Sequence, residues 1–284
     1  MAGLPSRAPA GGDPRVPGPG PPLRQHRPPR RHPELSGGRV VGLYRDEAVV
    51  LRTYKLGESD RIVVLLTAGR GKLRAVAKGV RRTGSRLGGR LEPGTHVQLQ
   101  LYEGRELDVV TQAEAVDQFR AIRGDLARLR DALALLEAVD QVGREGEADA
   151  RLFAMLLGGL RTLATRPAPL VVAGFYWKLL ALEGTAPMVD ACVRCGAGSG
   201  LVALDLAEGG AVCRACLPTG GGRRAVSPEA LALVARILGG DLAGALATPT
   251  GPLAAEVTDL ATQALEAHLE RRLRVPRLLD RSPH

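Results

Sequence analysis

The sequence contains few aromatic residues and no long uninterrupted hydrophobic segment. Aromatic residues make up 3% of its 284 residues, so a folded core has to be built from leucine, valine and alanine. The longest apolar stretch, residues 170–182, is broken by Gly174 and Lys178, and it is shorter than the roughly 18 apolar residues of a membrane helix. The N-terminus lacks the apolar segment of a secretory signal. These absences predict a protein without a membrane partner.

The motifs of common enzyme classes are missing as well. The Gly71-Lys72 pair is not followed by serine or threonine, so the sequence has no phosphate-binding loop of the nucleotide-hydrolase type. The five histidines are scattered, and we expect His96, at the start of a strand, to be a surface residue rather than a base. Glu58 and Asp60 are interpreted as turn and salt-bridge residues. We therefore predict that the protein is not an enzyme.

Hydrophobic periodicity divides the chain into two folded parts. Between residues 43 and 118, short apolar or alternating runs predict five strands, at about residues 49–51, 62–66, 73–77, 97–101 and 107–111. A longer insertion, residues 79–95, separates the third run from the fourth. This arrangement favours a small Greek-key barrel of the OB type, in which closure removes exposed sheet edges. An SH3-like barrel is the nearest alternative.

The second part, residues 119–275, has the 3.6-residue period of helices. Expected helices lie at about residues 126–139, 148–164, 169–183, 227–239 and 253–273. The adjacent aromatic residues Phe175, Tyr176 and Trp177 are interpreted as core rather than as a partner-binding pocket. The predicted fold is thus α+β and multidomain: an N-terminal OB-type β-barrel is followed by an α-helical domain, with a cysteine-bearing loop inserted at residues 188–220.

The two ends of the chain differ from these folded parts. Residues 1–42 hold half of the 20 prolines and seven arginines, with only Asp13 and Glu34 as acids. Such a segment buries too little apolar surface to offset its ordering entropy, so we predict a disordered extension. A basic arm that binds DNA is the alternative. Residues 276–284 are expected to form a C-terminal tail.

The four cysteines form two close pairs. Cys192 and Cys195 are followed, after 17 residues, by Cys213 and Cys216. Two C-x-x-C pairs at this spacing are typical of a zinc site, because two tight turns together present four sulfurs to one ion. Four thiolates leave no position open for water, so we predict one structural Zn²⁺ and a reducing, cytoplasmic location. A redox role is the alternative, although a thioredoxin-like motif needs a single pair in a βαβ setting.

Positive charge is abundant and locally concentrated. The formal net charge is +9 and the isoelectric point is about 10.0. Such a field attracts polyanions over a Debye length, about 8 Å at physiological salt. Eight cations lie between residues 70 and 90, with no acidic residue among them: Arg70, Lys72, Arg74, Lys78, Arg81, Arg82, Arg86 and Arg90. A charge run can be only a solvated loop, but in a predicted barrel this one favours nucleic-acid binding.

The expected mode of DNA binding follows from the residue types around this run. Along one strand Lys72, Arg74 and Lys78 would share a face. The barrel segment has only three tyrosines to stack on bases, namely Tyr44, Tyr54 and Tyr102. We therefore expect binding dominated by phosphate contacts and tolerant of sequence.

Several of these segments resemble the RecO family of bacterial DNA repair proteins. The resemblance rests on residues 43–47, 57–61, Gly71-Lys72, 77–82 and Ser85, and on the order of barrel, helices, cysteine pairs and helices. It covers about residues 43 to 275. The family usually begins near residue 43, which implies that residues 1–42 are an extension.

The resemblance implies a recombination mediator. Such a protein would bind single- and double-stranded DNA, anneal complementary strands and contact single-strand-binding protein. With RecR it would help RecA load onto coated single strands, in the cytoplasm and in association with the nucleoid. The basic surface of the family would correspond to Lys72, Arg74, Lys78, Arg81, Arg82 and Arg86, and the complete cysteine set implies zinc. From the residues alone, a zinc-containing RNA-binding or transcription accessory factor remains the alternative.

Overall fold

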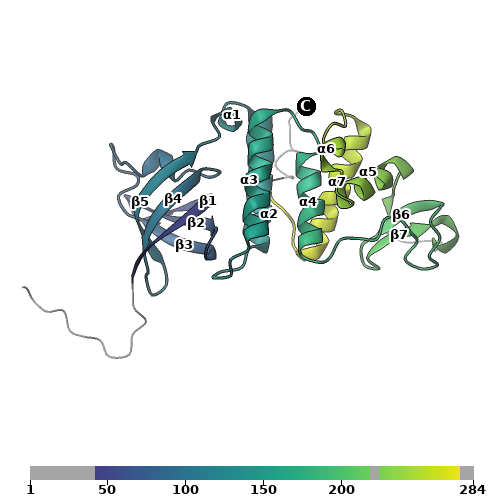
Figure 1. Cartoon of the computed structure of the whole chain (residues 1–284), viewed down its shortest axis with the longest axis horizontal. Coiled ribbons are helices and arrows are strands. Elements are labelled where there is room, and N and C mark those ends of the chain that lie inside the picture. Colours follow the sequence, from purple (N-terminus) through teal and green to yellow (C-terminus); the bar gives the residue numbers. More distant parts are fainter. Residues whose placement is uncertain (1–41, 218–223, 276–284) are drawn as a thin grey trace, which may run out of the picture. The chain divides into compact units, whose positions relative to one another are not determined.

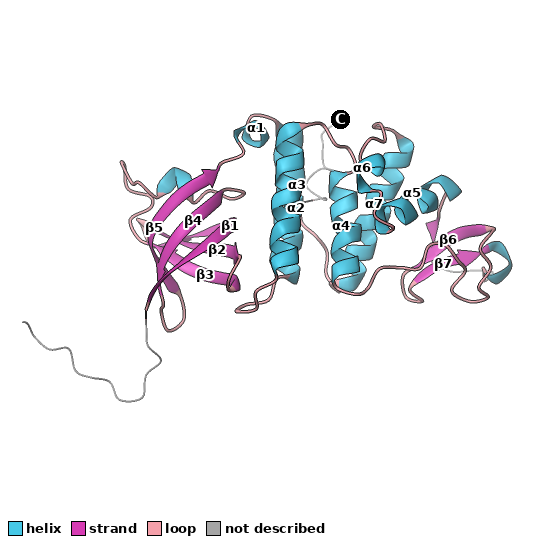
Figure 2. Cartoon of the chain, viewed as in Figure 1, coloured by secondary structure: helices cyan, strands magenta, loops and turns pink. Residues whose placement is uncertain are grey.

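The computed structural model describes residues 42–217 and 224–275. The predicted extension up to residue 41, the last part of the cysteine loop at 218–223 and the tail at 276–284 lie outside the described residues. Within the described part the protein is α+β, with a five-stranded β structure followed by a helical part that carries a second, small sheet (Figures 1 and 2).

The five N-terminal strands form a closed barrel in the order β1-β2-β3-β5-β4. They are β1 (Leu43–Leu56), β2 (Asp60–Thr67), β3 (Gly71–Ala77), β4 (His96–Tyr102) and β5 (Asp108–Asp117). All neighbours are antiparallel except β3 and β5, which pair in parallel over two residues. The connection between β3 and β4 contains the short 3₁₀ helix η1 (Gly88–Arg90). The five predicted strands are thus confirmed.

Alternation along the strands separates the inside of the barrel from its outside. Val63 and Leu65 of β2 and Ala75 of β3 belong to the barrel interior, whereas Val64 and Leu66 belong to the core of the helical part. Because successive side chains of a strand point to opposite faces, the outer face of β2 is where the helices pack. A β-bulge between Val50 and Arg52 shifts the register of β1, and Arg52 pairs with Val64 on the outer face.

The helical part begins with a short turn of helix and three longer helices. These are α1 (Arg120–Arg123), α2 (Leu126–Val142), α3 (Ala150–Thr165) and α4 (Val171–Leu182). Asp125 and Asp149 cap α2 and α3, because each carboxylate accepts two backbone N–H groups of the first turn. In α4, Tyr176 and Trp177 are fully buried and Phe175 is 5% exposed, so the expected core role of these aromatic residues is confirmed.

Three further helices follow the cysteine region: α5 (Pro228–Leu238), α6 (Leu242–Ala245) and α7 (Pro252–His268). Ser227 caps α5, with Pro228 at its start, as the sequence predicts. The last helix was expected to reach Leu273, and this was wrong. Glu270 has a positive φ of 50°, and the carboxylates of Glu266 and Glu137 accept the N–H groups of residues 273–275 in place of helical carbonyls.

The cysteine region is a small sheet rather than a bare loop. Its strands are β6 (Leu201–Asp205), β7 (Gly210–Cys213) and β8 (Arg224–Ala225), in the order β7-β6-β8. Figure 1 labels β6 and β7. The 3₁₀ helix η2 (Arg214–Cys216) follows β7. Sheet and cysteines together build a satellite core of Cys192, Val212 and Cys213.

One expectation about a single side chain was wrong. His96 is not a surface residue, because it is 3% exposed. A hydrogen bond of 2.5 Å joins its Nε2 to Oε1 of Glu47. Its ring also lies edge-on to Phe153 of α3. His96 is therefore part of the packing between the barrel and the helices. In the described part of the chain, no helix is both long and apolar enough to cross a membrane.

Candidate nucleic-acid interface and metal centre

The predicted run of cations divides into two groups with different surroundings. Arg70, Lys72 and Arg74 lie on or beside strand β3, and each has a carboxylate oxygen within 4.0 Å. The other five lie in or at the start of the connection between β3 and β4. Within the described residues none of them has a carboxylate that close: Lys78, Arg81, Arg82, Arg86 and Arg90. We call the first group the strand cations and the second the loop cations.

Lys72 joins the barrel to helix α2. Its ammonium group donates a 2.6 Å hydrogen bond to the main-chain oxygen of Asp140 and lies 3.9 Å from the carboxylate. Arg52 approaches the other carboxylate oxygen at 3.0 Å. Asp140 is only 5% exposed, and this burial raises the pKa of its carboxyl in spite of the two cations. Lys72 itself is 16% exposed, so most of its side chain is buried at this junction.

The backbone at the start of β3 reinforces the same junction. Lys72 donates its N–H to Arg144 and accepts from Gly146, so the connection between α2 and α3 extends the sheet beside β3. Gly71 has a φ of +68°, and a Cβ there would lie 1.9 Å from the main-chain oxygen of Glu147. Only glycine fits this position. The Gly71-Lys72 pair therefore has a structural task at the boundary between barrel and helices.

The two remaining strand cations also have partners. Arg70 stacks on the ring of Tyr44, with 3.8 Å between guanidinium carbon and ring centroid, and lies 3.8 Å from Glu103. Arg74 lies 3.3 Å from Glu145 but is 52% exposed. Unlike Lys72, both keep a large accessible surface. The shared strand face that we expect for Lys72, Arg74 and Lys78 is present for Lys72 and Arg74, whereas Lys78 follows the end of β3.

The loop cations are exposed and their backbone is held in place. The N–H of Gly79 donates a 2.7 Å hydrogen bond to Asp60, and the N–H of Arg81 donates to the oxygen of Ser59. The Arg81 guanidinium donates to the oxygen of Glu58 at 2.9 Å. The turn between β1 and β2 therefore braces the start of the loop. At its other end, Arg90 donates to the oxygen of Ala113 in β5.

Asp60 is the centre of this brace. The Gly79 N–H and the Ser59 hydroxyl hold the pKa of its carboxyl below the usual range, and Arg82 and Lys78 add to the effect. Glu58 lies in the turn that the sequence predicts, whereas Asp60 is the first residue of β2. In place of the predicted salt bridge, the carboxylate of Asp60 accepts hydrogen bonds from the Gly79 N–H and the Ser59 hydroxyl.

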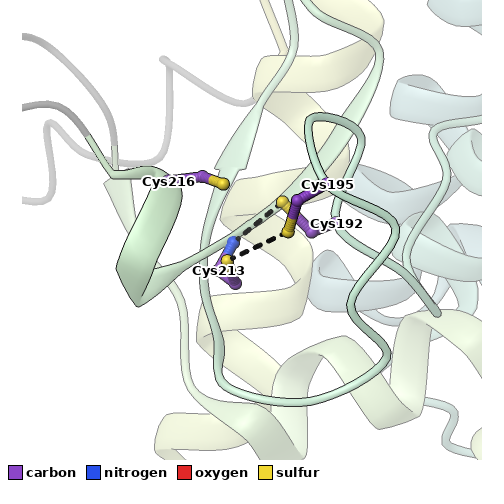
Figure 3. A group of neighbouring side chains, drawn as sticks. All are labelled: Cys192, Cys195, Cys213 and Cys216. Carbon is purple, nitrogen blue, oxygen red and sulfur yellow. Dashed lines mark hydrogen bonds between the residues drawn. The ribbon is translucent and has the colours of Figure 1, made fainter.

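The four cysteines come together as their spacing predicts. Their sulfur atoms all lie within 4.8 Å of one another, and the sulfurs of Cys195 and Cys213 are 3.6 Å apart (Figure 3). Four sulfurs placed tetrahedrally around an ion at about 2.3 Å would be about 3.8 Å apart, so the group fits a zinc ion. The N–H of Cys213 donates to the sulfur of Cys192 and lowers the pKa of that thiol, whereas hydrogen bonding to Cys195 and Cys213 raises the pKa of the Cys216 thiol.

An arginine joins the two cysteine turns independently of any metal. Arg194, inside the first pair, donates through Nε to Glu208 at 2.7 Å and through a second nitrogen to the other carboxylate oxygen. Its third nitrogen donates to the main-chain oxygen of Cys216 at 2.9 Å. A planar guanidinium suits such a three-way contact. Arg194 therefore holds the second cysteine turn beside the first.

A cavity of about 540 Å³ lies where strand β2 meets helices α2, α3 and α4. Its charged lining includes Arg144, Glu147 and Asp149. Glu147 and Arg144 face each other, and Asp149 caps α3. No histidine, cysteine, serine or threonine lines this cavity. The groups that would act as a nucleophile or a neutral base are therefore not gathered there.

The sequence gives no indication of the partners of the strand cations. Asp140 and Glu145 are distant from β3 along the chain, and only the packing of α2 on the barrel brings them close. The sequence feature that comes nearest to indicating this junction is Gly71, a glycine that precedes a lysine at the start of a strand.

Comparison with known proteins gives matches along almost all of the described part. The sequence profile of the family described as Recombination protein O N terminal matches residues 41–119, and that of Recombination protein O C terminal matches residues 123–277. A protein named DNA repair protein RecO from Frankia casuarinae is 46% identical over 245 residues, or 84% of this chain and 99% of the relative. A protein of the same name from a Nocardioides species is 45% identical over 250 residues, or 84% of this chain and all of the relative.

Proposed function

This chain belongs to the RecO family of DNA repair proteins, and from that premise we propose that it is a DNA-binding recombination mediator. It binds single- and double-stranded DNA, anneals complementary strands and performs no covalent chemistry. Together with RecR it helps RecA load onto single strands coated by single-strand-binding protein, in the cytoplasm and at the nucleoid.

The barrel is of the OB type. The closed order β1-β2-β3-β5-β4, with a parallel contact only between β3 and β5, supports this assignment. OB barrels recognise oligonucleotides through the face of the middle strands and the adjoining loops. The long connection between β3 and β4 is such a loop, and it carries the loop cations.

The observation that carries the proposal is the set of five exposed cations that, in the described part of the chain, have no carboxylate oxygen within 4.0 Å. Paired cations have already lost part of their electrostatic reach, whereas unpaired ones neutralise phosphates and release counterions. The brace between Asp60 and Gly79 holds the loop backbone in place, which lowers the ordering cost of binding. The primary DNA contacts are therefore assigned to Lys78, Arg81, Arg82, Arg86 and Arg90, with Arg70 and Arg74 at the margin and Lys72 at the helix junction.

A charge-reversal experiment tests this assignment. The triple variant Arg81→Glu, Arg82→Glu, Arg86→Glu should lower the affinity for DNA at least a hundredfold in a gel-shift series at moderate salt. The matched control reverses three exposed arginines of α3 and its C-terminal cap, Arg151, Arg161 and Arg166, and so changes net charge equally. If both variants lose DNA affinity equally, the loss is explained by the change in net charge, and this would contradict a specific DNA-binding surface on the loop.

A strand-annealing assay separates the mediator from the alternative of an RNA-binding or transcription accessory factor. The mediator should accelerate annealing of complementary DNA strands, also when these are coated with single-strand-binding protein. Binding of structured RNA without any acceleration of DNA annealing would favour the alternative.

The four cysteines hold one structural zinc ion. Cys192, Cys195, Cys213 and Cys216 supply four sulfur ligands, and a filled tetrahedral shell stabilises the fold without binding a reactive water. Elemental analysis of the purified protein should give one zinc per chain. Chelation should lower the melting temperature, because the satellite core around the cysteines is small. A metal content near zero in protein of unchanged stability would contradict this assignment.

A further inference from the structure

Each of the two cysteine pairs encloses one arginine, and the two arginines have different surroundings. Arg194 lies inside the first pair and Arg214 inside the second. The guanidinium of Arg194 makes three hydrogen bonds. Arg214 is exposed, and its side chain makes no hydrogen bond or ion pair with any residue that the structure describes. Because both carry the same charge beside the same cysteines, a comparison of the two separates the effect of contacts from the effect of charge.

A braced turn presents Glu208 to Arg194. Glu208 lies in the connection between β6 and β7, where the carboxylate of Asp205 accepts two N–H groups of the turn, at 3.2 and 3.3 Å. Asp205 is itself 7% exposed, and Gly209 closes the turn with a φ of +78°. Arg194 donates to both carboxylate oxygens of Glu208, which is the bidentate geometry of a strong pair. The guanidinium is therefore fixed to the small sheet.

The third contact of Arg194 reaches η2, the helical turn that carries Cys216 (Figure 3). A guanidinium nitrogen donates to the main-chain oxygen of Cys216 at 2.9 Å. Within the described residues, main-chain groups of η2 make one other hydrogen bond to the rest of the cysteine region, from the N–H of Arg214 to the oxygen of Gly200. Arg194 thus supplies one of the two hydrogen bonds that place this turn, and it is the one at Cys216.

A metal site binds its ion more tightly when the ligands are in place beforehand. The two cysteine pairs are separated by 17 residues, and an ion that alone had to hold both turns together would also have to order this connection. Arg194 joins the first pair, the turn of Glu208 and the second pair through the protein's own hydrogen bonds. Removal of a group that orients metal ligands typically lowers metal affinity about 10- to 100-fold.

We propose that Arg194, held by Glu208, is a positioning residue that gives the cysteine site its high affinity for zinc and its slow release of the ion. This inference rests on the proposed zinc site and adds the residues that retain the metal. Arg194 acts through the position of Cys216 rather than through its charge, because Glu208 neutralises that charge. The planar guanidinium makes three contacts at fixed angles, and the single ammonium group of a lysine does not reproduce them.

The test measures zinc binding by the full chain and by four variants. Zinc affinity is obtained by competition with a chromophoric chelator, and the release rate is followed after mixing with an excess of the same chelator. The variants are Arg194→Ala, Arg194→Lys and Glu208→Gln. The matched control is Arg214→Ala, which removes the same charge from the second cysteine pair but breaks no side-chain contact in the described part of the chain.

Arg194→Ala should bind zinc about 10- to 100-fold more weakly and release it correspondingly faster. Arg194→Lys should recover only part of this loss, and Glu208→Gln should lose less, because the amide keeps one oxygen that accepts a hydrogen bond. Arg214→Ala should stay within about twofold of the unsubstituted chain. At saturating Co²⁺, Arg194→Ala should keep the visible absorption of a four-thiolate site, which shows that all four cysteines still bind and that the region still folds.

Three outcomes would overturn the inference. Arg194→Ala could bind and release zinc as the unsubstituted chain does. Arg214→Ala could lose as much affinity as Arg194→Ala, or Arg194→Lys could restore all of it, and either result would assign the effect to charge. A changed Co²⁺ spectrum in Arg194→Ala would also contradict it, because Arg194 would then be needed for folding of the region. These failures leave the zinc site intact, whereas an unsubstituted chain that binds no zinc would remove the site itself.

Discussion

The strand cations and the loop cations are continuous in sequence but differ in almost every physical respect. Lys72 is mostly buried and bound to Asp140, whereas Arg82 is exposed and has no carboxylate within 4.0 Å among the described residues. Both carry the same charge. The difference teaches that a charge run is not one functional unit, because the fold decides which cations stabilise the protein and which remain available to a polyanion.

The distinction follows from the way helix α2 packs against the barrel. Asp140 enters a position where water is scarce, and Arg52 and Lys72 offset part of the cost of burying its charge. The loop after β3 lies beyond this contact and is braced by main-chain hydrogen bonds and Asp60 instead. The loop cations therefore form no ion pair with a carboxylate within 4.0 Å among the described residues, and their charge remains available for ligand binding.

The largest expected effect comes from substituting one glycine in each region: Gly71, beside the strand cations, and Gly84, among the loop cations. Gly71→Ala should lower the free energy of unfolding by about 3 kcal/mol or more, because strain at positive φ adds to a collision with the Glu147 backbone. Gly84→Ala, in the loop, should cost only about 1 kcal/mol, since its φ is +83° but no atom lies within 4 Å of the new Cβ. Urea unfolding followed by circular dichroism measures both. Equal losses would remove the structural distinction between the regions.

A smaller effect is expected from truncating one cation of each region. Lys72→Ala should lower the free energy of unfolding by about 2 kcal/mol, because a charged hydrogen bond is lost and Asp140 stays buried with Arg52 as its only close cation in the described residues. Arg82→Ala should change it by less than about 0.5 kcal/mol. The same urea titrations measure this pair. A stability loss in Arg82→Ala as large as that in Lys72→Ala would show that the loop cation is also structural.

The smallest expected effect concerns the brace and depends on pH. Hydrogen bonds from Gly79 and Ser59 lower the pKa of Asp60 in the folded protein, so its contribution to stability is present above the unfolded pKa of about 3.9 and is lost as the pH falls through the lower folded value. Unsubstituted protein should therefore be more stable than Asp60→Asn at pH 7, and the difference should shrink below about pH 4.

Thermal unfolding between pH 3 and pH 7 follows this difference. Glu114→Gln serves as the control, because this exposed carboxylate of β5 makes no hydrogen bond or ion pair within the described residues. A stability difference for Asp60→Asn that stays constant over the whole range would contradict the role of the charged carboxylate.

Local patterns predicted most of the fold. Five strands follow from period-two runs, the helices follow from the period of 3.6, and Ser227 with Pro228 marks the start of α5. The cysteine group also follows from spacing, because a C-x-x-C turn needs no distant information to bring two sulfurs together.

What could not be predicted depends on contacts between distant parts of the chain. Asp140 meets Lys72 only because α2 packs on the barrel. The same holds for His96, whose burial follows from the approach of Phe153. A hydrophobic pattern with a period of two predicts which side chains face outward. It does not predict whether a helix or solvent covers that face.

The most direct test of the division between the two groups of cations is the salt dependence of DNA affinity. The logarithm of the association constant is measured against the logarithm of salt concentration for the unsubstituted chain, Lys72→Ala and Arg82→Ala. Loss of one phosphate contact lowers the steepness by about 0.7–0.9, so Arg82→Ala should show this change and Lys72→Ala should show none. A decrease of the same size in Lys72→Ala would contradict the account, because it would place that lysine on the DNA.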